Sequence, residues 1–155
     1  MSRAFVRESE GGEAFEDLPD RPISPHHLVT PEGLAQMDAE IEAAERRLAE
    51  AQTADDKAEI ARLSRDLRYW SARRMSAEVV PPPTDMSHVR FGARVTFERE
   101  DGRRQTYRIV GEDEADPAKG NLSYVSPLAQ ALMGKEVGDT VPIGQSTAEI
   151  VRIEV

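Results

Sequence analysis

The pattern of apolar and polar residues between positions 30 and 79 predicts two helices that pair as an antiparallel hairpin. Apolar positions recur at alternating steps of three and four, which places them on one narrow stripe of each helix. These positions are Leu34, Met37, Ile41, Ala44, Leu48 and Ala51, then Ile60, Leu63, Leu67, Trp70 and Ala77, with Arg74 as an exception. Thr30-Pro31-Glu32 is typical of a helix start, and Thr53, three residues before Asp56, is expected to open the second helix. The short turn within residues 53–59 then requires antiparallel arms.

A second pattern, with a period of two, begins near His88 and predicts β-strands. Residues 90–97 and 105–110 alternate between apolar and polar side chains, with the turn signal Asp101-Gly102 between them. Residues 122–125, 140–143 and 147–154 are expected to form further strands, and Ser126-Pro127 begins a short helix. Together these elements predict an α+β fold, in which an antiparallel α-helical hairpin (coiled coil) precedes an antiparallel sheet domain with one short helix.

Composition divides the chain into four segments. Residues 1–29 are acidic and poor in apolar side chains, which predicts a disordered tail. Residues 30–79 are the predicted hairpin. Residues 80–87 contain three consecutive prolines and are expected to form a stiff linker. Residues 88–155 are the predicted sheet domain.

Charge and residue usage exclude several classes of function. The 155 residues carry a formal charge of −9, which disfavours non-specific binding to nucleic acid or to an anionic membrane, so a protein partner is expected. The chain has no cysteine, and the adjacent His26-His27 pair lacks further ligands at helical spacing, so no metal site is predicted. No apolar run approaches transmembrane or signal-peptide character, and a cytoplasmic location is expected.

Several motifs follow one another along the chain: Thr30-Pro31-Glu32-Gly33, residues 89–93, residues 107–117, residues 126–132 and residues 134–139. With these motifs in this order, the chain resembles the GreA/GreB family of bacterial transcription elongation factors from about Val29 to Val155. The resemblance implies an FKBP-like C-terminal domain that docks on RNA polymerase at the rim of its secondary channel, while the hairpin enters the channel. Acidic residues at the hairpin tip of Gre factors help to hold a second Mg²⁺ so that the polymerase cleaves backtracked RNA.

The resemblance also has implications for chemistry. The chain is expected not to be an enzyme by itself, although it acts on RNA polymerase catalysis. The isolated chain is expected to be a monomer and to bind no cofactor. Mg²⁺ of the polymerase active site is expected to matter only if the tip reaches it. Contact with transcript or DNA is expected only within the polymerase complex, and no contact with a membrane is expected.

The predicted tip departs from the family pattern. Cleavage-competent Gre factors carry a Gly-Asp-x-x-Glu-Asn-x-Glu-Tyr signature there, which residues 50–72 do not reproduce. The hairpin is also shorter by roughly ten residues per arm, which corresponds to roughly 15 Å of helix. In both respects the chain is similar to the short-hairpin Rnk proteins. The acids Asp55, Asp56 and Glu59 are the catalytic candidates, and capping of the second helix or a regulatory contact inside the channel are the alternatives.

Two further groups of residues are candidate contact sites by this resemblance. Val125, Ser126, Pro127 and Leu128 match the family segment that contacts polymerase, and the alternative is an ordinary capped helix. A basic face on the second arm matches a patch that meets transcript RNA in Gre factors, and the alternative is a solvated helix face. That face consists of Arg62, Arg65 and Arg68, with Arg73 and Arg74 nearby. The acidic loop Glu112, Asp113, Glu114 and Asp116 is expected either to face basic residues of the partner or to be solvated, and the family motif favours a structural role.

Three functions therefore compete at this point. The first is a regulator that binds the polymerase secondary channel without strong cleavage activity. The second is a transcript-cleavage factor that uses Asp55, Asp56 or Glu59. The third, a peptidyl-prolyl isomerase, is suggested only by the FKBP-like fold, and a fold does not carry a function. The aromatic residues for such a pocket are few: Phe91, Phe97, Tyr107 and Tyr124.

Overall fold

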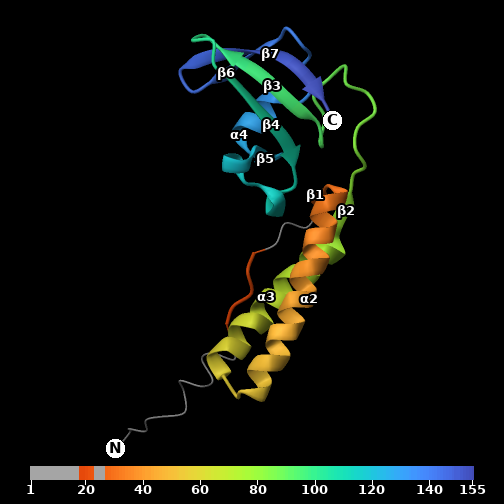
Figure 1. Ribbon diagram of the computed structural model, residues 1–155, viewed down its shortest axis with the longest axis vertical. Coiled ribbons are helices and arrows are strands. Elements are labelled where there is room, and N and C mark those ends of the chain that lie inside the picture. Colours follow the sequence, from red (N-terminus) through yellow and green to blue (C-terminus); the bar gives the residue numbers. More distant parts are fainter. Residues whose placement is uncertain (1–17, 23–26) are drawn as a thin grey trace, which may run out of the picture. The chain divides into compact units, whose positions relative to one another are not determined.

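A computed structural model describes residues 18–22 and 27–155 of the chain, and these residues form two compact units (Figure 1). The smaller unit contains residues 18–22 and 35–76. The larger unit contains residues 27–34 and 77–155, so it takes in more of the chain than the predicted sheet domain at 88–155. The predictions for residues 1–17 and 23–26, His26 included, fall outside the described residues.

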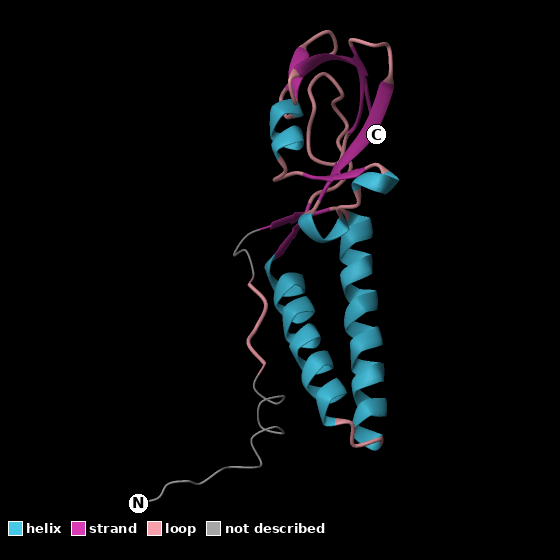
Figure 2. Cartoon of the chain, turned by 90° about the vertical axis from the view of Figure 1, so that its left-hand side faces the viewer, coloured by secondary structure: helices cyan, strands magenta, loops and turns pink. Residues whose placement is uncertain are grey.

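Two helices form the hairpin. Helix α2 spans Pro31–Thr53 and helix α3 spans Lys57–Ser76, and they run side by side in both views of the ribbon (Figures 1 and 2). The predicted apolar stripe is buried at Met37, Ala44 and Ala51 of α2 and at Leu63 of α3. On α3 the other predicted members Ile60, Leu67 and Trp70 are only partly buried. Arg74, the exception in the stripe, donates from Nε to Asp38 across the hairpin at 2.8 Å. An exposed ion pair of opposite arms therefore takes the place of an apolar contact.

A pair of short parallel strands flanks the hairpin in sequence, which the residue pattern did not predict. Strand β1 (His27–Val29) pairs with β2 (Ala77–Val79), with His27 opposite Ala77. The prediction of a disordered tail up to residue 29 is therefore wrong, because residues 27–29 form β1. The prediction of a helical hairpin up to residue 79 is wrong as well, because α3 ends at Ser76 and residues 77–79 form β2. Extended backbone is favoured at 79–80 because two β-branched residues precede a proline.

The larger unit is built on a five-stranded sheet with the order β5-β4-β3-β7-β6. Neighbouring strands are antiparallel except β4 and β5, which pair in parallel, so the sheet is mixed rather than wholly antiparallel. The strands are β3 (Arg94–Arg99), β4 (Arg104–Val110), β5 (Asn121–Ser123), β6 (Thr140–Ile143) and β7 (Ser146–Glu154). Two short 3₁₀ turns, η1 (Glu112–Glu114) and η2 (Pro117–Lys119), fill the connection between β4 and β5.

The core of this unit lies between the sheet and helix α4 (Pro127–Leu132). Ala129 and Leu132 of the helix are fully buried together with Phe97, Ile109 and Ile150 of the sheet. Leu28 of β1 packs against the same core, and the larger unit continues from β1 to Leu34 in the first turn of α2. The predicted α+β class, a helical hairpin followed by a sheet with one short helix, is confirmed.

Candidate functional site

The hairpin tip consists of residues 54–56, between the end of α2 and the start of α3. Asp55 has a φ of 53°, a left-handed conformation that a short Asp side chain tolerates. The next residue, Asp56, accepts a hydrogen bond from the Glu59 N–H at 3.2 Å, and its carbonyl oxygen accepts the Ile60 N–H at 2.9 Å. Asp56 is therefore the N-cap of α3.

The prediction that Thr53 opens the second helix is wrong. Its hydroxyl donates to the Ala49 carbonyl at 3.0 Å, a bond within the last turn of α2. The chain then needs the left-handed Asp55 to reverse direction, which moves the cap three residues along to Asp56. The Asp56 and Glu59 pair keeps the three-residue spacing of a capping box.

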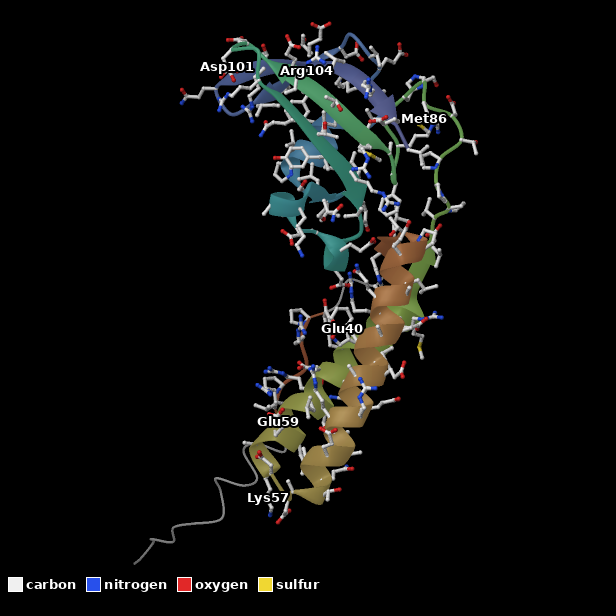
Figure 3. All side chains as sticks on the ribbon, in the orientation of Figure 1. Glu40, Lys57, Glu59, Met86, Asp101 and Arg104 are labelled. Carbon is white, nitrogen blue, oxygen red and sulfur yellow. The ribbon has the colours of Figure 1, made fainter. Side chains whose placement is uncertain are left out.

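Of the three candidate acids Asp55, Asp56 and Glu59, two are already engaged. Glu59 pairs with Arg62 one turn further along α3, with 2.5 Å between Oε1 and Nη2 (Figure 3 labels Glu59). Asp56 is engaged as the cap. The Asp55 carboxylate has no hydrogen-bond partner among the described residues and the residue is exposed, although its N–H donates to the Gln52 carbonyl at 3.2 Å. Among all the residues that the structure describes, no group of three or more His, Asp or Glu side chains is placed to hold a metal ion.

The predicted basic face on α3 has a neighbour in the same unit. The segment 18–22 runs beside α3 in Figures 1 and 2, and Arg68 donates from Nε to Asp20 at 2.6 Å. Leu18 lines a surface hollow together with Arg62 and Arg65. Two of the three predicted residues therefore border one hollow, and the third is paired with the N-terminal segment.

The segment around Ser126 combines a helix cap with an exposed apolar edge. Ser126 Oγ accepts the Ala129 N–H at 3.2 Å and Pro127 is the first helical residue, which confirms the expected start of α4. Val125 is 51% exposed, whereas Leu128 is partly buried against the core. Val125 and Pro127 are therefore available to a partner, while Ser126 and Leu128 hold the segment in place.

The acidic loop has a structural role that only the structure reveals in detail. Glu114 accepts hydrogen bonds from the Thr30 N–H at 3.1 Å, from the Thr30 hydroxyl and from the Gly111 N–H at 3.0 Å. The Thr30 hydroxyl in turn accepts the Gly33 N–H at 3.0 Å, as an N-cap of α2. Glu114 thus joins the η1 loop to the first turn of the hairpin.

Comparison with known proteins matches this chain to one family. The family model described as transcription elongation factor, GreA/GreB, C-term matches residues 83–155. The transcription elongation factor GreA of Ruegeria pomeroyi is 36% identical over 155 residues, covering 81% of this chain and 96% of the relative. GreB of Pseudomonas aeruginosa is 35% identical over 150 residues, covering 82% of this chain and 89% of the relative.

This chain belongs to the GreA/GreB family. It is therefore a transcription elongation factor of the Gre type. Among solved structures, Gfh1 of Thermus thermophilus is similar with a TM-score of 0.40 and 19% identity, covering 84% of this chain and 99% of that one. In the described residues, no helix is both long and apolar enough to span a membrane.

The part of this GreA/GreB chain that matches the family model contains the Ser126 segment and leaves out the hairpin tip. The matched residues 83–155 also leave out Thr30 and Gly33, whose hydrogen bond caps the start of α2.

A further contact at the start of α2 was not predicted from the sequence. Arg108 of β4 donates to Glu32 at 3.3 Å, and the Arg108 side chain is only 18% exposed. Hydrogen bonding to backbone N–H, assisted by the charge of Arg108, lowers the pKa of Glu32 from its ordinary value.

The aromatic residues that a prolyl isomerase pocket would need are used elsewhere. Phe97 is fully buried and stacks on Tyr107 with 6.0 Å between ring centroids. Phe91 meets Tyr124 edge to face at 5.4 Å. The Tyr124 hydroxyl also accepts the Leu28 N–H at 3.2 Å. Phe91 alone of the four borders the large apolar hollow beside the proline linker.

Proposed function

We propose that this protein binds bacterial RNA polymerase at the secondary channel and modulates elongation without strongly stimulating RNA cleavage. The sheet unit docks through Val125 and Pro127, which Ser126 and Leu128 support, and the hairpin enters the channel. Membership of the GreA/GreB family supports polymerase as the partner. The exposed Val125 beside a capped helix start supports the docking segment.

The observation that carries the weak-cleavage part of the proposal is the engagement of the tip acids. A carboxylate that completes the coordination of Mg²⁺ must present its oxygen at about 2.0–2.1 Å in near-octahedral geometry. A metal would compete with the cap that Asp56 Oδ1 provides, which is worth about 1 kcal/mol, and with the pairing of Glu59 to Arg62. Both acids therefore already make contacts with which a metal held by the polymerase would have to compete.

Asp55 favours the second candidate function, a cleavage factor that acts through Asp55, Asp56 or Glu59. Its carboxylate is exposed at the turn and has no partner within the described residues. One carboxylate that is free at the tip could add a ligand to a metal in the polymerase active site. In that case Mg²⁺ would be a cofactor of the polymerase and not of the isolated chain.

A cleavage assay separates the two candidates. Stalled and backtracked polymerase complexes with labelled RNA are incubated with the protein, and a cleavage-competent GreA serves as positive control. We expect saturable binding and a cleavage rate close to that of polymerase alone. A clear stimulation of cleavage that Asp55→Ala or Asp56→Ala abolishes would instead establish the second function.

The docking segment is tested by a matched pair of exposed valines. Val125→Glu is expected to weaken polymerase binding, because a charge replaces an apolar contact at the interface. Val137→Glu is the control, since Val137 is exposed to a similar degree (56%, against 51% for Val125) but lies outside the segment. Equal effects of the two substitutions would contradict the assigned docking surface.

A further inference from the structure

The α3 face and the segment 18–22 show complementary chemistry. Asp20 accepts from Arg68 at 2.6 Å, and Arg68 also donates from Nη2 to the Leu18 carbonyl at 3.3 Å. Arg68 is therefore held by a carboxylate and a backbone oxygen of the same short segment. A phosphodiester would offer this arginine the same kind of anionic acceptor.

Two further contacts fix the segment on α3. The Arg21 guanidinium lies 3.6 Å from the centroid of the Tyr69 ring, and its Nη1 is 3.9 Å from Asp66 Oδ1. Asp66 and Tyr69 are three residues apart and therefore lie on the same helix face. Asp20 and Arg21 thus each meet a residue of opposite charge on α3. A uniformly acidic or uniformly basic segment would not make both contacts.

The local sequence prepares the segment for this position. Residues 18–22 read Leu-Pro-Asp-Arg-Pro, so a proline stands directly before and after the two charged residues. Each proline fixes its own φ and biases the preceding residue towards extended backbone. The segment consequently loses less conformational entropy on docking than a flexible acidic tail of the same charge would lose.

The arginine face of α3 contains a hydrogen-bond donor, on Arg65, that is not used among the described residues. Its Nε is shielded from solvent and has no hydrogen-bond partner in the described part of the chain. The hollow that Arg65 lines with Leu18 and Arg62 lies next to the segment. An anionic strand on this face would supply an acceptor for Arg65 Nε, and it would need the position that residues 18–22 occupy.

We propose that residues 18–22 form a strap that occupies the arginine face of α3 and competes there with the phosphate backbone of single-stranded nucleic acid. The strap holds Arg68 through Asp20 and the Leu18 carbonyl in the free protein, and a nucleic-acid strand displaces it. The inference rests on the proposed function only for the choice of nucleic acid as ligand. It is tested without polymerase, so its failure leaves polymerase docking untouched.

The binding test uses the full-length protein and a fluorescently labelled single-stranded RNA oligonucleotide at low ionic strength. Asp20→Asn should tighten binding by roughly threefold, as expected when one exposed ion pair no longer competes. Glu42→Gln is the matched control, because it removes the same charge from a pair with Arg46 on α2. Arg68→Ala should weaken binding. Equal tightening by Asp20→Asn and Glu42→Gln would show a general charge effect and overturn the proposal.

A second measurement follows the strap itself. The {¹H}-¹⁵N nuclear Overhauser effects of the Asp20 and Arg21 amides should be those of ordered backbone in the free protein. They should fall to values of flexible chain in Arg68→Ala and when RNA is added to the unchanged protein. Flexible values in the free protein, or ordered values that RNA leaves unchanged, would overturn the proposal.

Discussion

The Glu114 carboxylate accepts the backbone N–H of Thr30 at 3.1 Å and links two residues that are 84 positions apart in the chain. The same carboxylate accepts the Gly111 N–H, so one side chain satisfies donors of both the η1 loop and the start of α2. The positive end of the helix dipole lies at this start and favours a negative charge there. Glu114 therefore performs the task of a helix cap from a distant part of the sequence.

Loss of this carboxylate should destabilise the larger unit. We expect Glu114→Ala to lower the free energy of unfolding by about 1–3 kcal/mol, because partly buried donors lose their acceptor. Urea denaturation followed by circular dichroism measures the change. Glu149→Ala, which removes an exposed carboxylate from β7, should leave stability nearly unchanged. Similar losses for both variants would refute the special role of Glu114.

Gly33 should resist a substitution that normally stabilises helices. Replacing a helical glycine with alanine usually gains about 1 kcal/mol. Here a Cβ on Gly33 would overlap the Glu114 carboxyl group, so Gly33→Ala should destabilise the protein. In the double variant with Glu114→Ala the overlap is gone, and Gly33→Ala should become neutral or stabilising. A double-mutant cycle with no coupling between the two positions would contradict this account.

The capping assignment at the hairpin tip predicts unequal effects of two neighbouring substitutions. Asp56→Ala should cost about 1 kcal/mol of stability, because the first turn of α3 loses its cap. Thr53→Ala should cost less, since its hydroxyl only adds a bond to a carbonyl within α2. Thermal unfolding of both variants provides the comparison. A larger loss for Thr53→Ala would restore the assignment made from sequence spacing.

Asp85 should remain ionised to unusually low pH. Hydrogen bonds from Ser87, with help from Arg90, lower its pKa from 3.8 to about 2. The folded state thus favours the carboxylate, so its stabilising contribution is present above pH 3.8 and is lost as the pH falls towards 2. Ser87→Ala should raise the pKa of Asp85 more than Arg90→Ala does. NMR titration of the side-chain carboxyl carbon tests the order of these two effects.

Periodicity predicted the parts of this fold that depend on local pattern. The stripe of Met37, Ala44 and Ala51 and the cap at Ser126 could be predicted because each depends on residues within a few positions. Strand β1 was missed because three residues carry little signal and the partner strand lies 50 residues further along. The parallel pairing of β4 and β5 was missed because it depends on tertiary packing.

The candidate site divides in the same way. The acids of the tip were found from composition, but their roles depend on the left-handed turn at Asp55, which no spacing rule indicated. Glu114 and Arg108 were missed as partners of the α2 start because both act across the chain on Thr30 and Glu32. The motif Thr30-Pro31-Glu32-Gly33 and the acidic loop were both visible as sequence features. Only the structure shows that these two sequence features contact each other and together cap the start of α2.

The pairing of β1 with β2 has a consequence for how such a protein can diversify. The chain leaves the larger unit after Leu34, in the first turn of α2, and returns to it at β2, which pairs with β1. An equal insertion or deletion in both arms of the hairpin therefore leaves both attachment points where they are. The arms can therefore differ in length by whole helical turns while both ends of the hairpin stay attached to the same pair of strands.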